Sequence, residues 1–325
     1  MQAVTDALVS ERSIVRGWLM RGTLHLIDAD DFGWLLALLG PIFSTGNQAR
    51  HAQLGLTPEI KKRGVTAIRR ILTSDGPLTR HQIVDRLRAH GIALDPRTQA
   101  PIHLIQTAAL AGVLCLGPDT ESGEPTYVLI KDWLGRRGTL SIDIALAELA
   151  RRYFSAYGPA TFDDFLAWSG LPASRARAGL TDAVKKLNEI SVHGRSAFLL
   201  KGRLRGWPTR STSAPAVRLL PAFDTYLLGY ATRDLYVAPV LQRRLQRGGG
   251  WIHPCVVVDG RAVAAWSLQR TGQQGRIDVE PYERLNAHTR LAIESEARDI
   301  GRFLDVDLTA RIGEPAVAPA PRPTP

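Results

Sequence analysis

A degenerate internal repeat limits the possible folds more than any other feature of the sequence. Residues 57–135 and 139–203 carry the same order of predicted elements, with three amphipathic helices followed by two short apolar runs around a turn. In the first copy, Thr57 and Thr79 are predicted N-caps of two helices and residues 97–112 form the third. The apolar runs VLCLG and TYVLI follow, separated by turn-forming residues, and predict a hairpin.

The second copy has the same order. A helix is expected from Ser141 through Tyr157, a second helix with Thr161 as its cap, and a third over residues 172–187. EISVHG and SAFLLKG form the matching hairpin. Three helices and a two-stranded wing make the winged-helix arrangement, a variant of the helix-turn-helix.

The third helix of a winged helix can enter the major groove of DNA, so its outer face supplies candidate contacts. In the first copy Ile102, Ile105 and Ala109 form the apolar face, and the opposite face carries Gln99, His103 and Gln106. In the second copy Arg175 and Lys186 lie off the apolar face. Many winged helices make only protein contacts, so DNA contact and protein contact both remain open here.

The stretch from Val15 to Ile27 is the most apolar part of the N-terminal region, and it predicts one or two strands. If Leu24 and Leu26 point into a core, strand alternation places three polar side chains on the other face, namely Arg21, Thr23 and His25. A half-buried strand with a solvated face explains this pattern, and so does a face that lines a DNA-binding surface.

A helix preceded by an acidic cluster follows this stretch. Asp28 is the predicted N-cap, Asp31 lies near the positive end of the helix, and Pro41 is expected to end it. Paired carboxylates can hydrolyse glycosidic bonds, but helix capping explains the cluster more simply. Residues 42–56 are expected to be irregular.

The character of the sequence changes at Trp207, after which apolar runs alternate with tight turns, including an Asp-Gly hairpin at Asp259. A small antiparallel sheet or barrel is expected there, followed by a helix from Tyr282 to Leu304. Asp224 interrupts an apolar run read as a strand, so it needs a partner such as Arg21 or Arg233, or a role in a site.

The predicted fold class is therefore α+β, with tandem winged-helix units packed on a small C-terminal antiparallel β-barrel or sheet. The expected domains are the remainder of a first winged helix, a second and a third winged helix, a β-rich domain with a closing helix, and a disordered Pro/Ala-rich tail; they span residues 1–56, 57–138, 139–206, 207–312 and 313–325.

The charge of the chain favours a polyanionic partner. The net charge is +10, and six of the 41 basic residues are lysine. A GC-rich coding sequence explains the preference for arginine but not the excess of positive charge, so double-stranded DNA is the expected partner. The sequence predicts no membrane span, metal site or cofactor, and it favours two buried thiols at Cys115 and Cys255 over a disulfide. We expect a cytoplasmic, nucleoid-associated monomer.

Five stretches together resemble the AlkZ/YcaQ-type winged-helix DNA glycosylases, in matching order over nearly the whole chain. They are VRGWLMRGTLHL (15–26), AALAGVLCLGP (108–118), YGPATFDDFLAWSGL (157–171), LLPAFDTYLLGY (219–230) and GGGWIHPCVVVDGRAVAAW (248–266). The resemblance implies three tandem winged helices around a β-barrel, which form a basic DNA channel. It also implies release of alkylated purines or unhooking of interstrand cross-links.

The catalytic signature of that family is Gln-apolar-Gln or Gln-apolar-Asp, a few dozen residues before the RGTLH strand. The early glutamine Gln2 stands in MQAVTD, which does not match, and no glutamine pair takes that place. We therefore assign no catalytic residue and expect the N-terminal segment with this motif to be absent from these residues. A non-catalytic DNA-binding or regulatory protein is the alternative function, and a protein-interaction scaffold is disfavoured by the charge.

Overall fold

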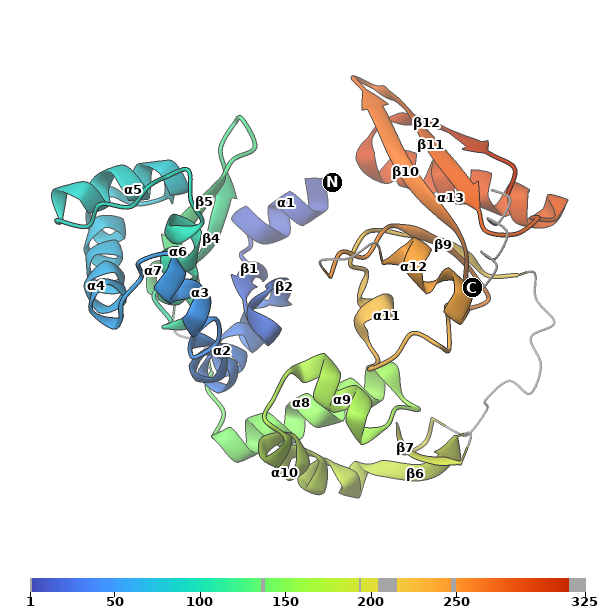
Figure 1. Ribbon diagram of the computed structural model, residues 1–325, viewed down its shortest axis with the longest axis horizontal. Helices are drawn as coiled ribbons and strands as arrows, with labels where there is room; N and C mark the ends of the chain where they lie inside the picture. Colours follow the sequence, from blue (N-terminus) through green and yellow to red (C-terminus); the bar gives the residue numbers. More distant parts are fainter. Residues whose placement is uncertain (1, 136–137, 193, 204–214, 247–249, 316–325) are drawn as a thin grey trace, which may run out of the picture. The chain divides into compact units, whose positions relative to one another are not determined.

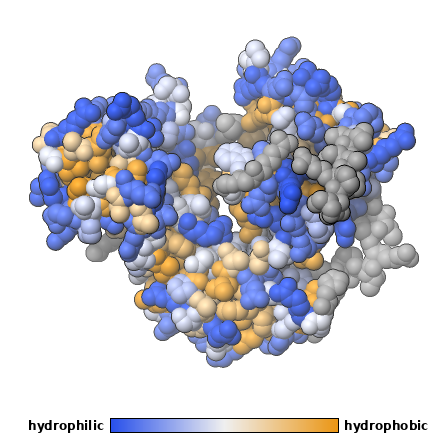
Figure 2. All heavy atoms as spheres, in the orientation of Figure 1, coloured by the Kyte–Doolittle hydropathy of each residue, from blue (hydrophilic) through white to orange (hydrophobic). Residues whose placement is uncertain are grey.

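The computed structural model describes residues 2–135, 138–192, 194–203, 215–246 and 250–315 of a mixed α+β protein (Figure 1). The chain divides into two compact units, residues 2–201 and residues 202–325. Hydrophilic residues cover much of the visible surface of each unit, with apolar patches between them (Figure 2). Each unit is described separately below.

The first unit begins with a helix, a hairpin and two further helices: α1 (Gln2–Val9), β1 (Ile14–Trp18), a 3-10 turn η1 (Met20–Gly22), β2 (Leu24–Asp28), α2 (Ala29–Ser44) and α3 (Gln48–Gln53). The predicted strands in this region are confirmed, and so is the Asp28 cap, whose carboxylate accepts a hydrogen bond from the Asp30 amide. Two expectations are wrong. Pro41 lies inside α2 and does not end it, and residues 48–53 form a helix within the stretch expected to be irregular.

The expected orientation of β2 is also wrong, because Leu24 and Leu26 are 52% and 56% exposed. His25 is half-buried and pairs with Gly17 across the hairpin, so the two residues share a face. That face packs on α2, since a Cβ on Gly17 would lie 2.5 Å from the Phe32 ring. The sequence pattern did not show that α2 covers this face.

The first repeat consists of α4 (Pro58–Asp75), β3 (Leu78–Thr79), α5 (Arg80–Ala89), α6 (Ala100–Leu110), β4 (Leu114–Asp119), β5 (Pro125–Leu129) and the short α7 (Ile130–Trp133). Both predicted caps are present: Thr57 accepts from the Ile60 amide, and Thr79 forms a capping box with Gln82. Ile105 and Ala109 of α6 are buried in the core of this repeat, as the helical spacing predicted.

The hairpin of the first repeat does not stand alone. It joins the N-terminal hairpin in one five-stranded sheet with the order β2-β1-β4-β5-β3. Arg16 of β1 supports this junction by donating to the Gly117 carbonyl (2.8 Å) and the Asp119 carboxylate (2.7 Å), and Trp18 stacks on Tyr127 with ring centroids 6.2 Å apart.

The second repeat consists of α8 (Ile142–Tyr157), α9 (Phe162–Ser169), α10 (Ala173–Ala183), a 3-10 turn η2 (Val184–Lys186), β6 (Leu187–Val192) and β7 (Arg195–Leu200). Its hairpin forms a separate two-stranded sheet. Arg152 of α8 ties this repeat to the N-terminal region, because it pairs with both Asp31 of α2 and Glu148. Ala176 and Leu187 of this repeat are buried, whereas Val184 is exposed.

The second unit is built on an open five-stranded sheet with the order β12-β11-β10-β9-β8, and helix α13 packs against it (Figure 1). Its elements are β8 (Val217–Leu220), α11 (Thr225–Leu228), η3 (Pro239–Leu241), α12 (Gln242–Leu245), β9 (Cys255–Val258), β10 (Arg261–Thr271), β11 (Gln274–Pro281), α13 (Ala287–Leu304) and β12 (Asp307–Ile312). The expected fully antiparallel sheet is corrected at one edge, because β12 runs parallel to β11. The crossover through α13 allows this pairing, since parallel neighbours need a long connection.

Asp224 does not interrupt a strand. It caps α11, and its carboxylate accepts from the Tyr226 amide at 2.8 Å. Arg233, one of its two suggested partners, donates instead to the Gln246 side chain at 3.2 Å. The Asp-Gly turn is confirmed by the pairing of Val258 with Arg261. Most of the predicted tail, residues 316–325, lies outside the described residues.

Both cysteines are free and buried, as expected for thiols in apolar surroundings. Burial raises the pKa of Cys115 to about 12. Across the described part of the chain, no helix combines the length and apolarity that crossing a membrane requires.

Candidate functional site

The RGTLH segment borders a small polar cavity in the first unit, which we call the Arg21 cavity. Its volume is about 260 Å³. The lining residues come from the turn η1, the end of α2, the loop before α3, helices α3 and α6 and the residue after α9: Arg21, Gly22, Phe43, Ser44, Gly46, Asn47, His51, Gln106, Thr107, Leu110 and Gly170. Three regions that are distant in the sequence therefore meet at this cavity.

Backbone geometry in the turn places Arg21 at the cavity. Arg21 has a φ of 56°, in the left-handed region, and Gly22 follows with a φ of 69°. Gln106 of α6 holds the turn by donating from Nε2 to the Gly22 carbonyl at 2.6 Å. The Arg21 guanidinium donates to the Trp168 carbonyl. Burial by the surrounding chain lowers the pKa of Arg21, and Tyr157 opposes this shift.

His51 forms a second polar wall of the cavity. It is only 6% exposed, and its ring meets His103 of α6 edge to face with centroids 5.2 Å apart. The Lys61 ammonium lies 3.5 Å from His51 Nδ1, while His51 Nε2 has no hydrogen-bond partner in the part of the chain that the structure describes. Burial lowers the pKa of His51, and Lys61 and His103 lower it further. The imidazole is therefore neutral near pH 7.

The predicted row of Arg21, Thr23 and His25 is not a strand face. Arg21 lies in the 3-10 turn, Thr23 follows it, and only His25 belongs to β2. Thr23 donates its hydroxyl to the Met20 carbonyl at 3.0 Å, and His25 Nδ1 lies 2.9 Å from the Thr23 carbonyl. Burial lowers the pKa of His25, and the contact with the Thr23 carbonyl opposes this shift. The Arg21 cation lowers the pKa of His25 further.

The polar face of α6 is occupied by contacts within the protein. Gln99 is exposed at the N-cap position and accepts a hydrogen bond from Arg50 at 2.8 Å. His103 meets His51, and its pKa is lowered by burial and by Arg50. Gln106 holds the Gly22 turn. The structure thus brings Arg21 and Gln106 together at the cavity and places His103 directly behind it.

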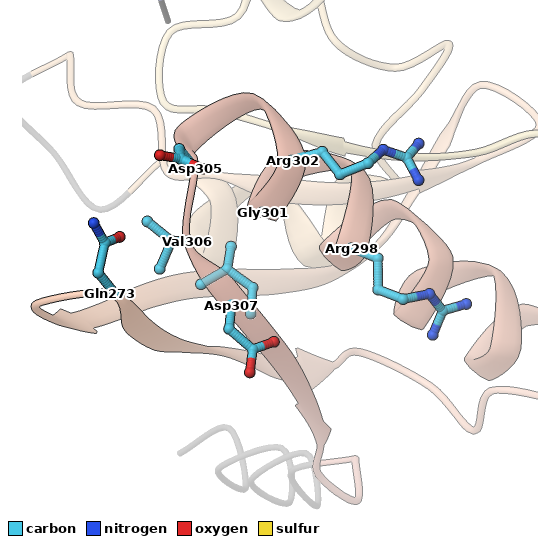
Figure 3. A pocket seen from close by; sticks show the side chains of 8 residues that line it. Gln273, Arg298, Gly301, Arg302, Asp305, Val306 and Asp307 are labelled. Atoms are coloured by element: carbon cyan, nitrogen blue, oxygen red, sulfur yellow. The ribbon is translucent and has the colours of Figure 1, made fainter.

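The remaining predicted residues lie elsewhere. Arg175 is exposed on α10, and Lys186 lies in η2, beside a separate hollow that is also lined by Asp182 and Glu148. Asp224 belongs to the second unit. That unit has an open hollow of about 600 Å³ at the end of α13, lined in part by Arg298, Arg302, Asp305 and Asp307; the two arginine side chains extend away from the two aspartates (Figure 3).

The sequence pattern did not identify His51, Asn47 or Lys61. His51 and Asn47 fall in the stretch expected to be irregular, where no periodicity marks a face. Lys61 was counted only as part of the net charge. A helix start after Asn47 was the available local signal, but it does not show that the helix would pack beside α6. Within the described ranges, no group of three His, Cys, Asp or Glu side chains could hold a metal ion.

Comparison with known proteins gives consistent matches over nearly the whole chain. The family model described as "DNA glycosylase AlkZ-like" matches residues 1–303. A relative named interstrand DNA cross-link repair glycosylase, from Streptomyces sahachiroi, is 31% identical over 306 residues, which cover 90% of this chain and 80% of the relative. The solved structure of the Streptomyces sahachiroi DNA glycosylase AlkZ is similar with a TM-score of 0.75 and 30% identity, covering 96% of this chain and 85% of that chain.

Proposed function

This chain belongs to the AlkZ-like DNA glycosylase family, and we propose that it binds double-stranded DNA as a monomer in the repair of alkylation damage. The lesions we propose are alkylated purines and interstrand cross-links, the latter from the name of the Streptomyces relative. We propose that it acts at the nucleoid, in the cytoplasm.

We also propose that residues 58–129 and 142–200 are winged-helix units. Each contains three helices followed by an antiparallel hairpin, and within residues 58–129 the short strand β3 also pairs with β5. This order matches the helix-turn-helix variant that places its third helix toward DNA. The second unit, with its open sheet, takes the place of the β-barrel that the resemblance implies.

The Arg21 cavity is the observation that carries the proposal of DNA binding. The RGTLH segment, which carries much of the family resemblance, places a guanidinium at a cavity whose described lining residues include no carboxylate. An arginine in such surroundings attracts an anion, and the net charge of +10 brings a polyanion to the surface.

The reaction we propose for this family is hydrolysis of the bond between an alkylated purine and its sugar. Alkylation makes a purine cationic and thus a good leaving group, so a protein needs mainly to place a water and stabilise the sugar cation. No glutamine of this chain matches the Gln-apolar-Gln motif, so we expect the 325 residues to bind DNA and to release little 7-methylated purine. This mismatch also supports the second candidate function, a DNA-binding protein without catalysis.

Salt dependence of duplex binding tests the proposal. Arg21→Ala and His25→Ala are expected to weaken binding, and binding by the unaltered chain should fall steeply between 50 and 200 mM salt, by about a thousandfold if about six phosphates are contacted. Binding that is equal at low and high salt would contradict the proposal. A collapse of the melting temperature in both variants would assign these residues a structural role instead.

A release assay separates the two candidate functions. The chain is incubated with DNA that contains 7-methylguanine, and free base is measured beside a DNA-only control. Robust release would show that catalytic residues lie among these 325 residues. Release at the control rate, together with salt-sensitive binding, would favour the non-catalytic function.

A further inference from the structure

The hydrogen-bond donors of the Arg21 cavity are not all used within the protein. The hydroxyl groups of Ser44 and Thr107 already donate to the backbone. Ser44 donates to the Pro41 carbonyl (3.0 Å), and Thr107 donates to the His103 carbonyl (2.8 Å). The nitrogen donors differ. Within the described residues Arg21 makes one hydrogen bond, to the Trp168 carbonyl, although a guanidinium carries five N–H groups. Among the described residues His51 Nε2 has no hydrogen-bond partner, and neither has Nδ1 of His103, whose ring it meets.

The surroundings of His51 determine which of its nitrogens carries the proton. An ammonium group can only donate, so the contact of 3.5 Å with Lys61 makes His51 Nδ1 an acceptor. In a neutral imidazole the proton then sits on Nε2. The unpartnered Nε2 is therefore a hydrogen-bond donor. Because His51 is only 6% exposed, this donor needs an acceptor other than bulk water.

The charge around the cavity selects the kind of acceptor. Arg21 lines it, Lys61 lies behind His51, and no carboxylate occurs among the described lining residues. A cationic alkylated base would be repelled by this arrangement. An anion with several acceptor oxygens satisfies both the guanidinium and the imidazole N–H.

We propose that the Arg21 cavity binds a phosphate group, with Arg21 and the Nε2–H of His51 as its donors. The DNA backbone is the source of this phosphate if the proposed function holds, and free inorganic phosphate is the other source. With a backbone phosphate bound, the cavity would position the duplex on the first unit.

Inorganic phosphate is the first probe, added to the full chain in place of chloride at equal ionic strength. We expect phosphate to raise the melting temperature, because a ligand that binds only the folded state stabilises it. His51→Leu should weaken phosphate binding about tenfold, which is the loss expected for one hydrogen bond to a charged group. His51→Gln retains an N–H donor and should keep most of the affinity.

The matched control is His81→Leu, since His81 is an exposed histidine of α5 outside the cavity. It should leave phosphate binding unchanged. A readout without any substitution is the nitrogen-15 NMR signal of the His51 ring, whose Nε2 resonance should shift on addition of phosphate. This measurement decides the matter if His51→Leu does not fold. A melting temperature equal in phosphate and chloride, or a His51 signal that does not move, would overturn the proposal.

Duplex DNA is the second probe. If His51→Leu loses affinity for phosphate and for DNA alike, the cavity holds a backbone phosphate. Loss for phosphate alone assigns the site to the free anion. If the unaltered chain binds phosphate through His51 but shows no salt-sensitive binding of DNA, the proposed function fails while the site stands. Unchanged phosphate binding in His51→Leu removes the site and leaves the proposed function intact.

Discussion

The third helices of the two repeats, α6 and α10, occupy equivalent places in the chain but use their polar faces differently. On α6, Gln106 and Gln99 are hydrogen-bonded to the η1 turn and to Arg50, and His103 lies against His51. On α10, Arg175 is exposed, and no hydrogen bond or ion pair links its side chain to the described residues. The polar face of α6 therefore contributes to a cavity in the first repeat, whereas Arg175 on α10 of the second repeat is open to solvent.

The hairpins differ in the same sense. In the first repeat, β4 pairs with β1 and extends a five-stranded sheet, whereas β6 and β7 of the second repeat form a sheet of two strands. The N-terminal region thus packs on the hairpin and the third helix of the first repeat. This contrast shows that a polar helix face does not by itself mark a surface for a partner.

Helix packing offers the strongest test of the contrast. A Cβ on Gly179 of α10 would lie 2.6 Å from the backbone oxygen of Leu146 in α8, whereas one on Gly64 of α4 would meet the Leu104 side chain at 2.7 Å. A helix backbone cannot move as a side chain can. We expect Gly179→Ala to lower the free energy of unfolding by about 2 kcal/mol and Gly64→Ala by about 1 kcal/mol or less. Urea denaturation of both variants measures this, and equal losses would contradict it.

The link between the second repeat and the N-terminal region should give the next largest effect. Arg152 pairs with Asp31 and Glu148 and lies over the Trp34 ring at 5.6 Å. Because Arg152 is partly exposed, solvent screens these pairs, and Arg152→Ala should cost about 1 to 2 kcal/mol. Urea denaturation again gives the value. The control is Arg97→Ala, whose pair with Asp95 is local, and a similar loss there would show that Arg152 has no linking role.

The two third helices can be compared directly. Gln106→Ala removes the hydrogen bond to the Gly22 carbonyl and should lower stability by about 1 kcal/mol. Arg175→Ala should leave the melting temperature unchanged and weaken duplex binding, with a salt slope smaller by about 1. Calorimetry and binding titrations at several salt concentrations measure both. If Arg175→Ala lowers stability and leaves DNA binding unaltered, Arg175 has a structural role and does not contact DNA.

Acid should affect the second repeat and the region where α3 meets the first repeat in different pH ranges. Burial lowers the pKa values of His51 and His103, so these groups stabilise the fold above their unfolded pKa of about 6.5, and this contribution is lost as the pH falls below it. In the second repeat, hydrogen bonds from Arg151 and Arg152 lower the pKa of Glu148 to about 2. The stability it provides is present above the unfolded pKa of about 4.3 and is lost as the pH falls further toward 2.

Melting temperatures between pH 8 and pH 3 measure these small effects. Exchange of both His51 and His103 for glutamine should flatten the profile below pH 6.5, while Glu148→Gln should flatten it only below about pH 4.3. A profile of the double variant that matches the unaltered chain would contradict the assignment to the histidine pair.

Local signals predicted much of the fold. Thr57, Thr79 and Thr161 cap their helices as expected, because a side-chain oxygen near free backbone amides is a local interaction. The Asp-Gly turn and both hairpins of the repeats were predicted for the same reason. Predictions that required knowledge of distant neighbours were less successful. Leu24 and Leu26 proved exposed, and Asp224 proved to be a helix cap.

The candidate site shows the same division. Arg21 and Gln106 were singled out by their polar character within apolar stretches, but nothing in their spacing indicates that Gln106 meets the turn of Arg21 and Gly22, 84 residues from Gly22 in the chain. His51 gave no periodic signal, and its unpartnered nitrogen is a property of the assembled cavity.

The sequence alone determined the helix caps, the turns, the repeat and the positive charge, because these depend on residues that are close in the chain or on composition. Only the tertiary structure decided that the N-terminal hairpin joins the first repeat, that α6 turns its polar face inward, and that Arg21 and His51 share a cavity. The physical reason is that burial and the pairing of polar groups depend on which surfaces pack together, and a periodic pattern gives a face but not its neighbour.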